Sequence, residues 1–193
     1  MSARRALITG VAGQDGSYLA ELLLERGYEV FGIVRGSPHA PYPNLAGVQN
    51  DVRLLQGDLL DQMTLLDAIT RAEPDELYNL AATSFVPASW RQPVMTAQFT
   101  AVGVTSMLEA VRITKPTLRV YQASTSEIFG ATTESPQTES TRQCSNPSVA
   151  TRFGTGGSSI WLLAALCRRW NAPAPPAGRG MAGSSASPHP VNR

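Results

Sequence analysis

The stretch Ala6-Leu-Ile-Thr-Gly10-Val-Ala-Gly13-Gln-Asp-Gly16-Ser-Tyr-Leu-Ala-Glu-Leu-Leu-Leu24 decides the fold. A short apolar run leads into three glycines spaced G-x-x-G-x-x-G, and apolar residues at helical spacing follow them. This order predicts a strand, a tight turn and a helix. In such a turn Gly10 supplies unusual backbone angles, Gly13 lets a pyrophosphate approach the main chain, and Gly16 lets the helix pack closely. The first N–H groups of the helix would then face an anion.

Three spaced glycines also occur in ordinary turns, so the context has to decide between the two interpretations. Here the glycines follow a strand pattern near the start of the sequence and open a helix pattern. That context is the one required of a dinucleotide-binding turn, which is the interpretation we favour.

Strand and helix patterns alternate along the next hundred residues. Strands are predicted at residues 6–9, 29–34, 51–56, 77–80 and 118–123, and helices at 16–26, 63–71 and within 93–114. Gly27 suits the C-terminal cap of the first helix, and the Pro-, Gly- and Asn-rich residues 37–50 predict a loop. Strands separated by helices of this length predict an α/β fold, a Rossmann-like doubly wound parallel sheet. Ligands of such sheets bind beyond the carboxyl ends of the strands.

Three predicted strands are followed by residues that suit a dinucleotide. Arg35 suits the 2′-phosphate of NADP, whereas NAD is favoured by an acidic residue at this place; a solvated surface arginine is the alternative. Asp58 could accept a hydrogen bond from the adenine amino group, or could cap the next helix. The small residues at 81–84 would leave room for a flat ligand against the backbone.

The fifth predicted strand runs into Ser124-Thr125-Ser126-Glu127. Thr125 could hydrogen-bond a sugar hydroxyl that is being oxidised, and Glu127 could take a proton from the carbon next to the resulting ketone. The alternative is that the hydroxyl groups cap the following turn and that Glu127 is solvated.

Composition gives no sign of several classes of partner. A formal net charge of +1 gives no indication of nucleic acid. No signal peptide precedes the first strand, and the late apolar run at 160–167 is too short to span a bilayer, so we expect a cytoplasmic protein without a membrane partner. Cys144 and Cys167 form neither a metal-ligand spacing nor a disulfide framework, and we expect no metal site.

The charge pattern changes near residue 143. The first 143 residues hold 11 basic and all 15 acidic residues, whereas residues 144–193 hold five arginines and no acid. We therefore expect a partial NADP-binding domain at 1–143 and an irregular tail at 144–193, whose composition suggests a translated wrong reading frame. In the tail, residues 158–169 could form a helix that covers a sheet edge or lies on a membrane surface, and 173–193 is expected to be disordered.

Three segments resemble the GDP-mannose 4,6-dehydratase family of extended short-chain dehydrogenases/reductases: LITGVAGQDGSYLAELLLERGYEVFGIVR, ELYNLAATSFVPASW and YQASTSEIFG. The likeness spans roughly residues 5–142. It implies a lyase that converts GDP-mannose to GDP-4-dehydro-6-deoxymannose, with C4 oxidised by NADP, water eliminated across C5 and C6, and hydride returned to C6. Members of this family form homo-oligomers, so the resemblance also implies association of identical chains.

The resemblance also implies roles for individual residues. Thr125 would assist oxidation at C4, and Glu127 would serve in the elimination of water. Gly36 stands where many relatives have a second arginine, which weakens the expected grip on the 2′-phosphate. The NADP site would consist of Gly10, Gly13, Gln14, Asp15, Gly16, Arg35, Asp58, Leu59, Leu80, Ala81, Ala82 and Ser84.

One feature of the family is absent from these 193 residues. The family carries a Tyr-x-x-x-Lys pair whose tyrosine removes the C4 hydroxyl proton, but the one lysine here, Lys115, precedes the fifth strand. Loss of a general base typically lowers the rate about 10²- to 10⁴-fold, so we expect impaired activity. The alternatives are a non-catalytic NADP-binding remnant, a non-functional gene fragment, or another nucleotide-sugar epimerase or dehydratase.

Overall fold

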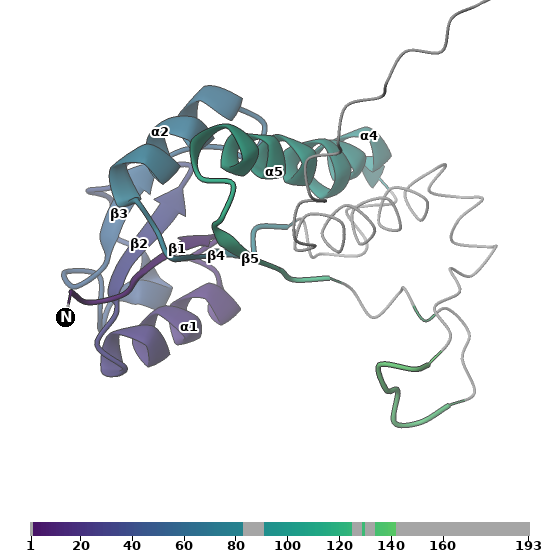
Figure 1. The fold of residues 1–193 in the computed structure, drawn as a ribbon, viewed down its shortest axis with the longest axis horizontal. Coiled ribbons are helices and arrows are strands. Elements are labelled where there is room, and N and C mark those ends of the chain that lie inside the picture. Colours follow the sequence, from purple (N-terminus) through teal and green to yellow (C-terminus); the bar gives the residue numbers. More distant parts are fainter. Residues whose placement is uncertain (1, 83–90, 125–128, 130–133, 142–193) are drawn as a thin grey trace, which may run out of the picture.

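The computed structural model describes residues 2–82, 91–124, 129 and 134–141 (Figure 1). The helix expected at 158–169 and the disorder expected at 173–193 lie outside these residues.

Five parallel strands form one sheet in the order β3-β2-β1-β4-β5. The sheet confirms the predicted Rossmann-like, doubly wound arrangement, and every predicted strand is found within two residues of its expected ends. The strands are β1 (Arg5–Thr9), β2 (Glu29–Val34), β3 (Arg53–Gln56), β4 (Glu76–Asn79) and β5 (Arg119–Gln122).

Helices cover both faces of the sheet, with α1 on one face and α2 and α5 together on the other (Figure 1). The helical elements are α1 (Gln14–Glu25), the 3₁₀ turn η1 (Pro43–Leu45), α2 (Gln62–Ala72), α4 (Pro93–Ala97), the π-helical turn η2 (Gln98–Val102) and α5 (Gly103–Thr114). Side chains alternate across each strand, so Ala6 and Ile8 of β1 are buried on the α1 side while Leu7 is buried on the other. Two apolar cores result, one on each face of the sheet.

Helix α1 ends as predicted at a glycine. Gly27 has φ +76°, and its N–H donates to the Leu24 carbonyl (2.9 Å) while the Tyr28 N–H donates to the Leu23 carbonyl (3.0 Å). This pair of bonds is a Schellman motif. The buried side of α1 is narrower than its apolar pattern indicates, because Tyr18 and Leu22 are 61% and 41% exposed.

The helical pattern at 93–114 forms three consecutive pieces rather than one regular α-helix. The π turn η2 adds an extra residue to one turn, so the face presented before it does not continue in register into α5. Val102, the last residue of η2, is 55% exposed, whereas Val104 and Met107 of α5 are buried.

This helical segment, Pro93–Thr114, is also the one helix in the described part of the chain that is long and apolar enough to cross a membrane. The criterion is one of length and composition, and the core helices of soluble proteins meet it too. Here α5 packs against α2 and the sheet, with Met107 and Val111 fully buried.

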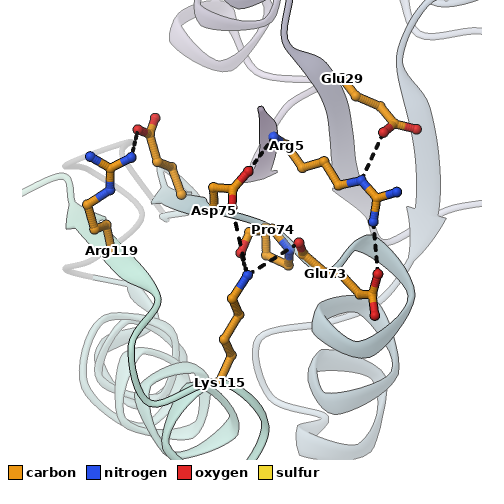
Figure 2. A network of polar contacts seen from close by, with 8 residues as sticks. Arg5, Glu29, Glu73, Pro74, Asp75, Lys115 and Arg119 are labelled. Atoms are coloured by element: carbon orange, nitrogen blue, oxygen red, sulfur yellow. Dashed lines mark hydrogen bonds and ion pairs between the residues drawn. The ribbon is translucent and has the colours of Figure 1, made fainter. Parts of the chain in front are cut away.

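Ion pairs and hydrogen bonds connect the elements at the amino-terminal edge of the sheet (Figure 2). The Arg5 guanidinium contacts the carboxylates of Glu29 and Glu73, each at 3.0 Å, and so joins β1 to β2 and to the end of α2. The Arg5 N–H donates to Asp75 (2.9 Å), and the Lys115 ammonium donates to the Pro74 carbonyl (2.7 Å). The start of β4 is thereby fixed to β1 and to the end of α5.

Candidate functional site

The carboxyl ends of all five strands lie at one edge of the sheet because the strands are parallel. The chain passes from β1 outward to β2 and β3, and then places β4 and β5 on the other side of β1. The strand order therefore reverses between β1 and β4, and ligands of such sheets bind at this switch point. The residues that follow β1 and β4 mark the candidate site.

Gly10 forms the floor of the site. Its φ of +71° lies in the region that favours glycine, which confirms the conformational role predicted for it. A Cβ on Gly10 would lie 2.9 Å from the Ala81 Cα, and the Leu80 N–H donates to the Thr9 carbonyl (3.2 Å). The structure thus brings the predicted residues Gly10, Leu80 and Ala81 together.

Gly16 packs the start of α1 against this turn. It is buried, and a Cβ there would overlap the Gly10 carbonyl oxygen and lie 2.7 Å from the Val11 Cα. Both neighbours are backbone atoms that cannot rotate away. The close helix packing predicted for Gly16 is therefore what the fold requires.

Gly13 differs from these two glycines because a side chain there would meet a single atom of the turn. It is exposed, has φ −77° and ψ 172°, which any residue adopts, and a Cβ on it would meet only the Gly10 carbonyl oxygen, at 3.2 Å. As the N-cap of α1 it provides no side-chain cap. A glycine here keeps the space beside the helix terminus open.

The N–H groups beside Gly13 suit an anion. In the described part of the chain, no hydrogen bond uses the N–H groups of Gln14, Asp15 or Gly16, which begin α1. Free N–H groups at a helix N-terminus, together with the helix dipole, form a site for phosphate. Gln14 and Asp15 are exposed. This donor set, next to the opening left by Gly13, fits a diphosphate group.

A side chain from the loop after β2 forms a hydrogen bond to the glycine turn between β1 and α1. The Asn44 side-chain amide, in η1, donates to the Ala12 carbonyl (2.9 Å). The sequence predicted only a loop at 37–50, and nothing in its composition singled out Asn44.

A buried polar network lies directly beneath the turn. The Thr9 hydroxyl donates to the Asn79 amide oxygen and accepts from the Ala81 N–H (3.2 Å). The Asn79 amide nitrogen donates to the Gln122 side-chain oxygen (2.7 Å), and the Gln122 amide donates to the Ala123 carbonyl (2.7 Å). The network connects the ends of β1, β4 and β5, and sequence analysis missed it because Thr9 and Asn79 read as ordinary polar ends of apolar strands.

Arg35 lies at the same edge, directly after β2. It is exposed, and its guanidinium carbon lies 5.6 Å from the centroid of the Phe99 ring in η2. No ion pair involves Arg35 within the described residues.

Two aspartates follow β3, and they accept different hydrogen bonds. The N-cap of α2 is Asp61, whose carboxylate accepts from the N–H groups of Met63 (3.0 Å) and Thr64 (3.4 Å). The alternative that Asp58 caps this helix is therefore wrong; its carboxylate instead accepts from the Leu60 N–H (2.9 Å).

Leu59 points its side chain into the core. It is 5% exposed, and a Cβ on Gly103 of α5 would lie 3.0 Å from the Leu59 Cβ. A coenzyme contact of Leu59, as predicted from the resemblance, would have to use its backbone.

Several predicted site residues lie outside the described residues. These are Ser84, Thr125 and Glu127. Ala82 and Ser124, which flank the undescribed segments, are exposed at the carboxyl edge of the sheet. Within residues 2–82, 91–124 and the short described pieces beyond, no group of three or more His, Cys, Asp or Glu residues is placed to hold a metal ion.

A parallel sheet with a glycine turn and a helix N-terminus at its switch point defines a Rossmann-like α/β protein. The family model of GDP-mannose 4,6 dehydratase matches residues 7–148. The chain belongs to the GDP-mannose 4,6-dehydratase family.

Individual relatives agree with this assignment. The GDP-mannose 4,6-dehydratase of Yersinia enterocolitica is 45% identical over 147 residues, which are 72% of this chain and 40% of the relative. That of Vibrio cholerae is 45% identical over 151 residues, or 73% of this chain and 40% of the relative. The chain therefore spans about 40% of the length of the curated relatives it matches.

Solved structures share the fold. The UDP-glucose 4-epimerase of Brucella ovis, solved in complex with NAD, superposes with a TM-score of 0.70 at 25% identity, covering 87% of this chain and 49% of the epimerase.

Proposed function

We propose that this chain binds NADP at the turn formed by Gly10, Gly13 and Gly16, as the coenzyme-binding part of a GDP-mannose 4,6-dehydratase. The observation that carries the proposal is the start of α1: Gly13 leaves the space beside it open, and the adjoining N–H groups have no partner in the described part of the chain. Glycine at an exposed N-cap next to free donors is explained by a diphosphate lying against the backbone.

The residues around the turn support NADP as the coenzyme. Nucleotide-sugar epimerases of this fold have been solved with NAD, as in Brucella ovis. In this chain the residue after β2 is Arg35, which is exposed and has no carboxylate partner among the described residues. A guanidinium at this place favours the 2′-phosphate of NADP, and the Asp58 carboxylate at the neighbouring strand end would accept from the adenine amino group.

The proposed reaction is that of the family. The chemistry that a bound nicotinamide coenzyme supplies is reversible hydride transfer with a sugar carbon. Thr125 would hydrogen-bond the C4 hydroxyl of GDP-mannose, and Glu127 would remove the C5 proton as water leaves across C5 and C6. In the sequence both come shortly after Ser124, and Ser124 lies at the carboxyl edge of the sheet, as does the proposed coenzyme site.

A second candidate function is coenzyme binding without turnover. It is favoured by the position of Lys115, the one lysine in the sequence, whose ammonium is held by the Pro74 carbonyl at the amino-terminal edge of the sheet. No lysine of these 193 residues is therefore available beside the coenzyme to lower the pKa of a catalytic tyrosine.

Two measurements on the 193-residue chain test these functions. Addition of NADP at a hundredfold excess over its dissociation constant should raise the free energy of unfolding by about 2.7 kcal/mol, which a thermal-shift titration detects. Incubation with GDP-mannose and NADP then separates the two candidates: slow appearance of a 4-keto sugar supports the dehydratase, and binding without product supports the second. A melting temperature unmoved by NADP would contradict both.

Three further expectations remain proposals. Residues 1–143 would form the coenzyme domain and 144–193 a separate tail, which limited proteolysis near residue 143 would test. The protein would act in the cytoplasm, and copies of the chain would associate as homo-oligomers, as light scattering would show.

A further inference from the structure

The guanidinium of Arg35 is held by an aromatic ring rather than by a carboxylate. The Phe99 centroid lies 5.6 Å from the guanidinium carbon, within the range of a cation–π contact. Phe99 itself is half-buried and packs against the core between the sheet and the helices α2 and α5. The ring is therefore a fixed support for a side chain that would otherwise move freely.

A ring contact leaves the hydrogen-bonding capacity of an arginine unused. The five N–H donors of a guanidinium lie in its plane, whereas a ring attracts the positive charge without accepting them as a carboxylate does. A carboxylate partner would occupy two of these donors and cancel the charge. Arg35 thus keeps both its charge and its donors for an anion at the carboxyl edge of the sheet.

The other arginine–phenylalanine pair in the described residues shows the contrast. The Arg53 guanidinium lies 5.5 Å from the Phe31 centroid, but it also contacts the Glu29 carboxylate at 2.6 Å. Arg53 begins β3 and so lies at the opposite, amino-terminal edge of the sheet. At Arg53 the ring contact therefore accompanies an ion pair, and the Glu29 carboxylate already neutralises the guanidinium.

We infer that Phe99 is the positioning residue that makes Arg35 selective for a 2′-phosphorylated coenzyme. This inference rests on the proposed function, and it adds that selectivity comes from a residue of the π turn η2, 64 positions from Arg35 in the sequence. With glycine at position 36, a single arginine has to recognise the phosphate, so its orientation decides the preference.

The test compares the affinities of the 193-residue protein for NADP and for NAD by calorimetry. Phe99→Leu keeps an apolar side chain against the core but removes the ring. We expect its affinity for NADP to fall roughly two- to fivefold, the size of one exposed cation–π contact, with no change in its affinity for NAD. Phe99→Trp should keep the preference for NADP. Adenosine 2′,5′-bisphosphate, which carries the phosphate without the nicotinamide half, should lose affinity for Phe99→Leu by the same factor.

Matched variants separate the possible outcomes. Arg53→Ala removes the other pair and should leave both coenzyme affinities unchanged. If Phe99→Leu lowers both affinities equally, or neither, Phe99 has no selective role and the inference is wrong. If the wild-type protein binds NAD as tightly as NADP, the coenzyme preference in the proposed function fails, and this result is visible before any variant is made.

Discussion

Two glycines of one turn, Gly13 and Gly16, differ in what a side chain would meet. At Gly16 the neighbours of a Cβ would be backbone atoms of Gly10 and Val11, so the glycine serves the packing of α1. At Gly13 a Cβ would meet only the Gly10 carbonyl oxygen, at 3.2 Å, and the glycine leaves the space beside the helix terminus open for the proposed diphosphate. Spacing alone predicts the three glycines as a set, but only the structure separates their purposes.

Gly16→Ala should destabilise the protein. The added methyl would overlap the Gly10 carbonyl oxygen and lie 2.7 Å from the Val11 Cα, and relieving that overlap requires a backbone shift. Overpacking of this kind costs about 1–3 kcal/mol, which urea unfolding would measure. Gly47→Ala is the control, because nothing lies within 4 Å of a Cβ there. Equal stabilities of the two variants would show that α1 does not pack on the turn.

The Thr9–Asn79 hydrogen bond should be strongly coupled. Asn79 is fully buried, and Asn79→Leu would leave the Thr9 hydroxyl without its acceptor, at a cost of about 1–3 kcal/mol. Thr9→Val combined with Asn79→Leu removes both partners, so the double variant should lose less stability than the sum of the two single variants. Strict additivity in a denaturant double-mutant cycle would contradict the network.

At the scale of the element, the strands could be predicted because their signal is local. A parallel strand buried on both faces is a short apolar run between turn residues, and β2 (Glu29–Val34) was predicted residue for residue. The π turn η2 could not be predicted, since its sequence QFTAV is compatible with an ordinary helix and its extra residue is a matter of packing. Phe99 belongs to that turn, so its contact with Arg35 could not be predicted from the sequence either.

The cap of α2 should contribute measurable stability. Asp61→Ala removes the acceptor for the N–H groups of Met63 and Thr64, and N-cap losses typically cost about 1 kcal/mol. Its thermal midpoint should fall while its affinity for NADP stays unchanged. Asp58→Ala should show the reverse, with a weaker effect on the midpoint and weaker NADP binding. Exchange of these two phenotypes would mean that the roles of the two aspartates are assigned wrongly.

Strand β4 contains a tyrosine whose ionisation should depend on the fold. Burial, followed by the hydrogen bond from its hydroxyl to Glu76 (2.6 Å), raises the pKa of Tyr78 to about 12. Because the folded state holds this proton more tightly than the unfolded chain does, the stabilisation is complete below about pH 10 and is lost as the pH rises towards 12.

Absorbance of tyrosinate against pH would measure this directly. In Tyr78→Phe the ionisation step near pH 12 should disappear. A step near pH 12 that persists in this variant would show that another group is responsible.

At the scale of the whole molecule, the two edges of the sheet are built differently. The amino-terminal edge is closed by ion pairs around Arg5 and by the bond between Lys115 and Pro74 (Figure 2). The carboxyl edge carries the free helix N-terminus and the exposed Arg35. The alternation of strands and helices predicted that the site lies at the carboxyl edge. It could not predict which residues contact the donor groups there, because contacts such as that of Phe99 with Arg35 join residues far apart in the chain.

The central claim is that the N-terminus of α1, opened by Gly13, binds the diphosphate of a nicotinamide coenzyme. Calorimetric titration of NADP into the wild-type protein and into Gly13→Ala tests it most directly, with urea unfolding of both proteins as the control for folding. We predict that the wild-type protein binds NADP and that Gly13→Ala, which should still unfold in one cooperative transition, binds it roughly tenfold more weakly or worse, the equivalent of one lost hydrogen bond to a charged group. Equal affinity in the two proteins, or no binding to either, would contradict the account.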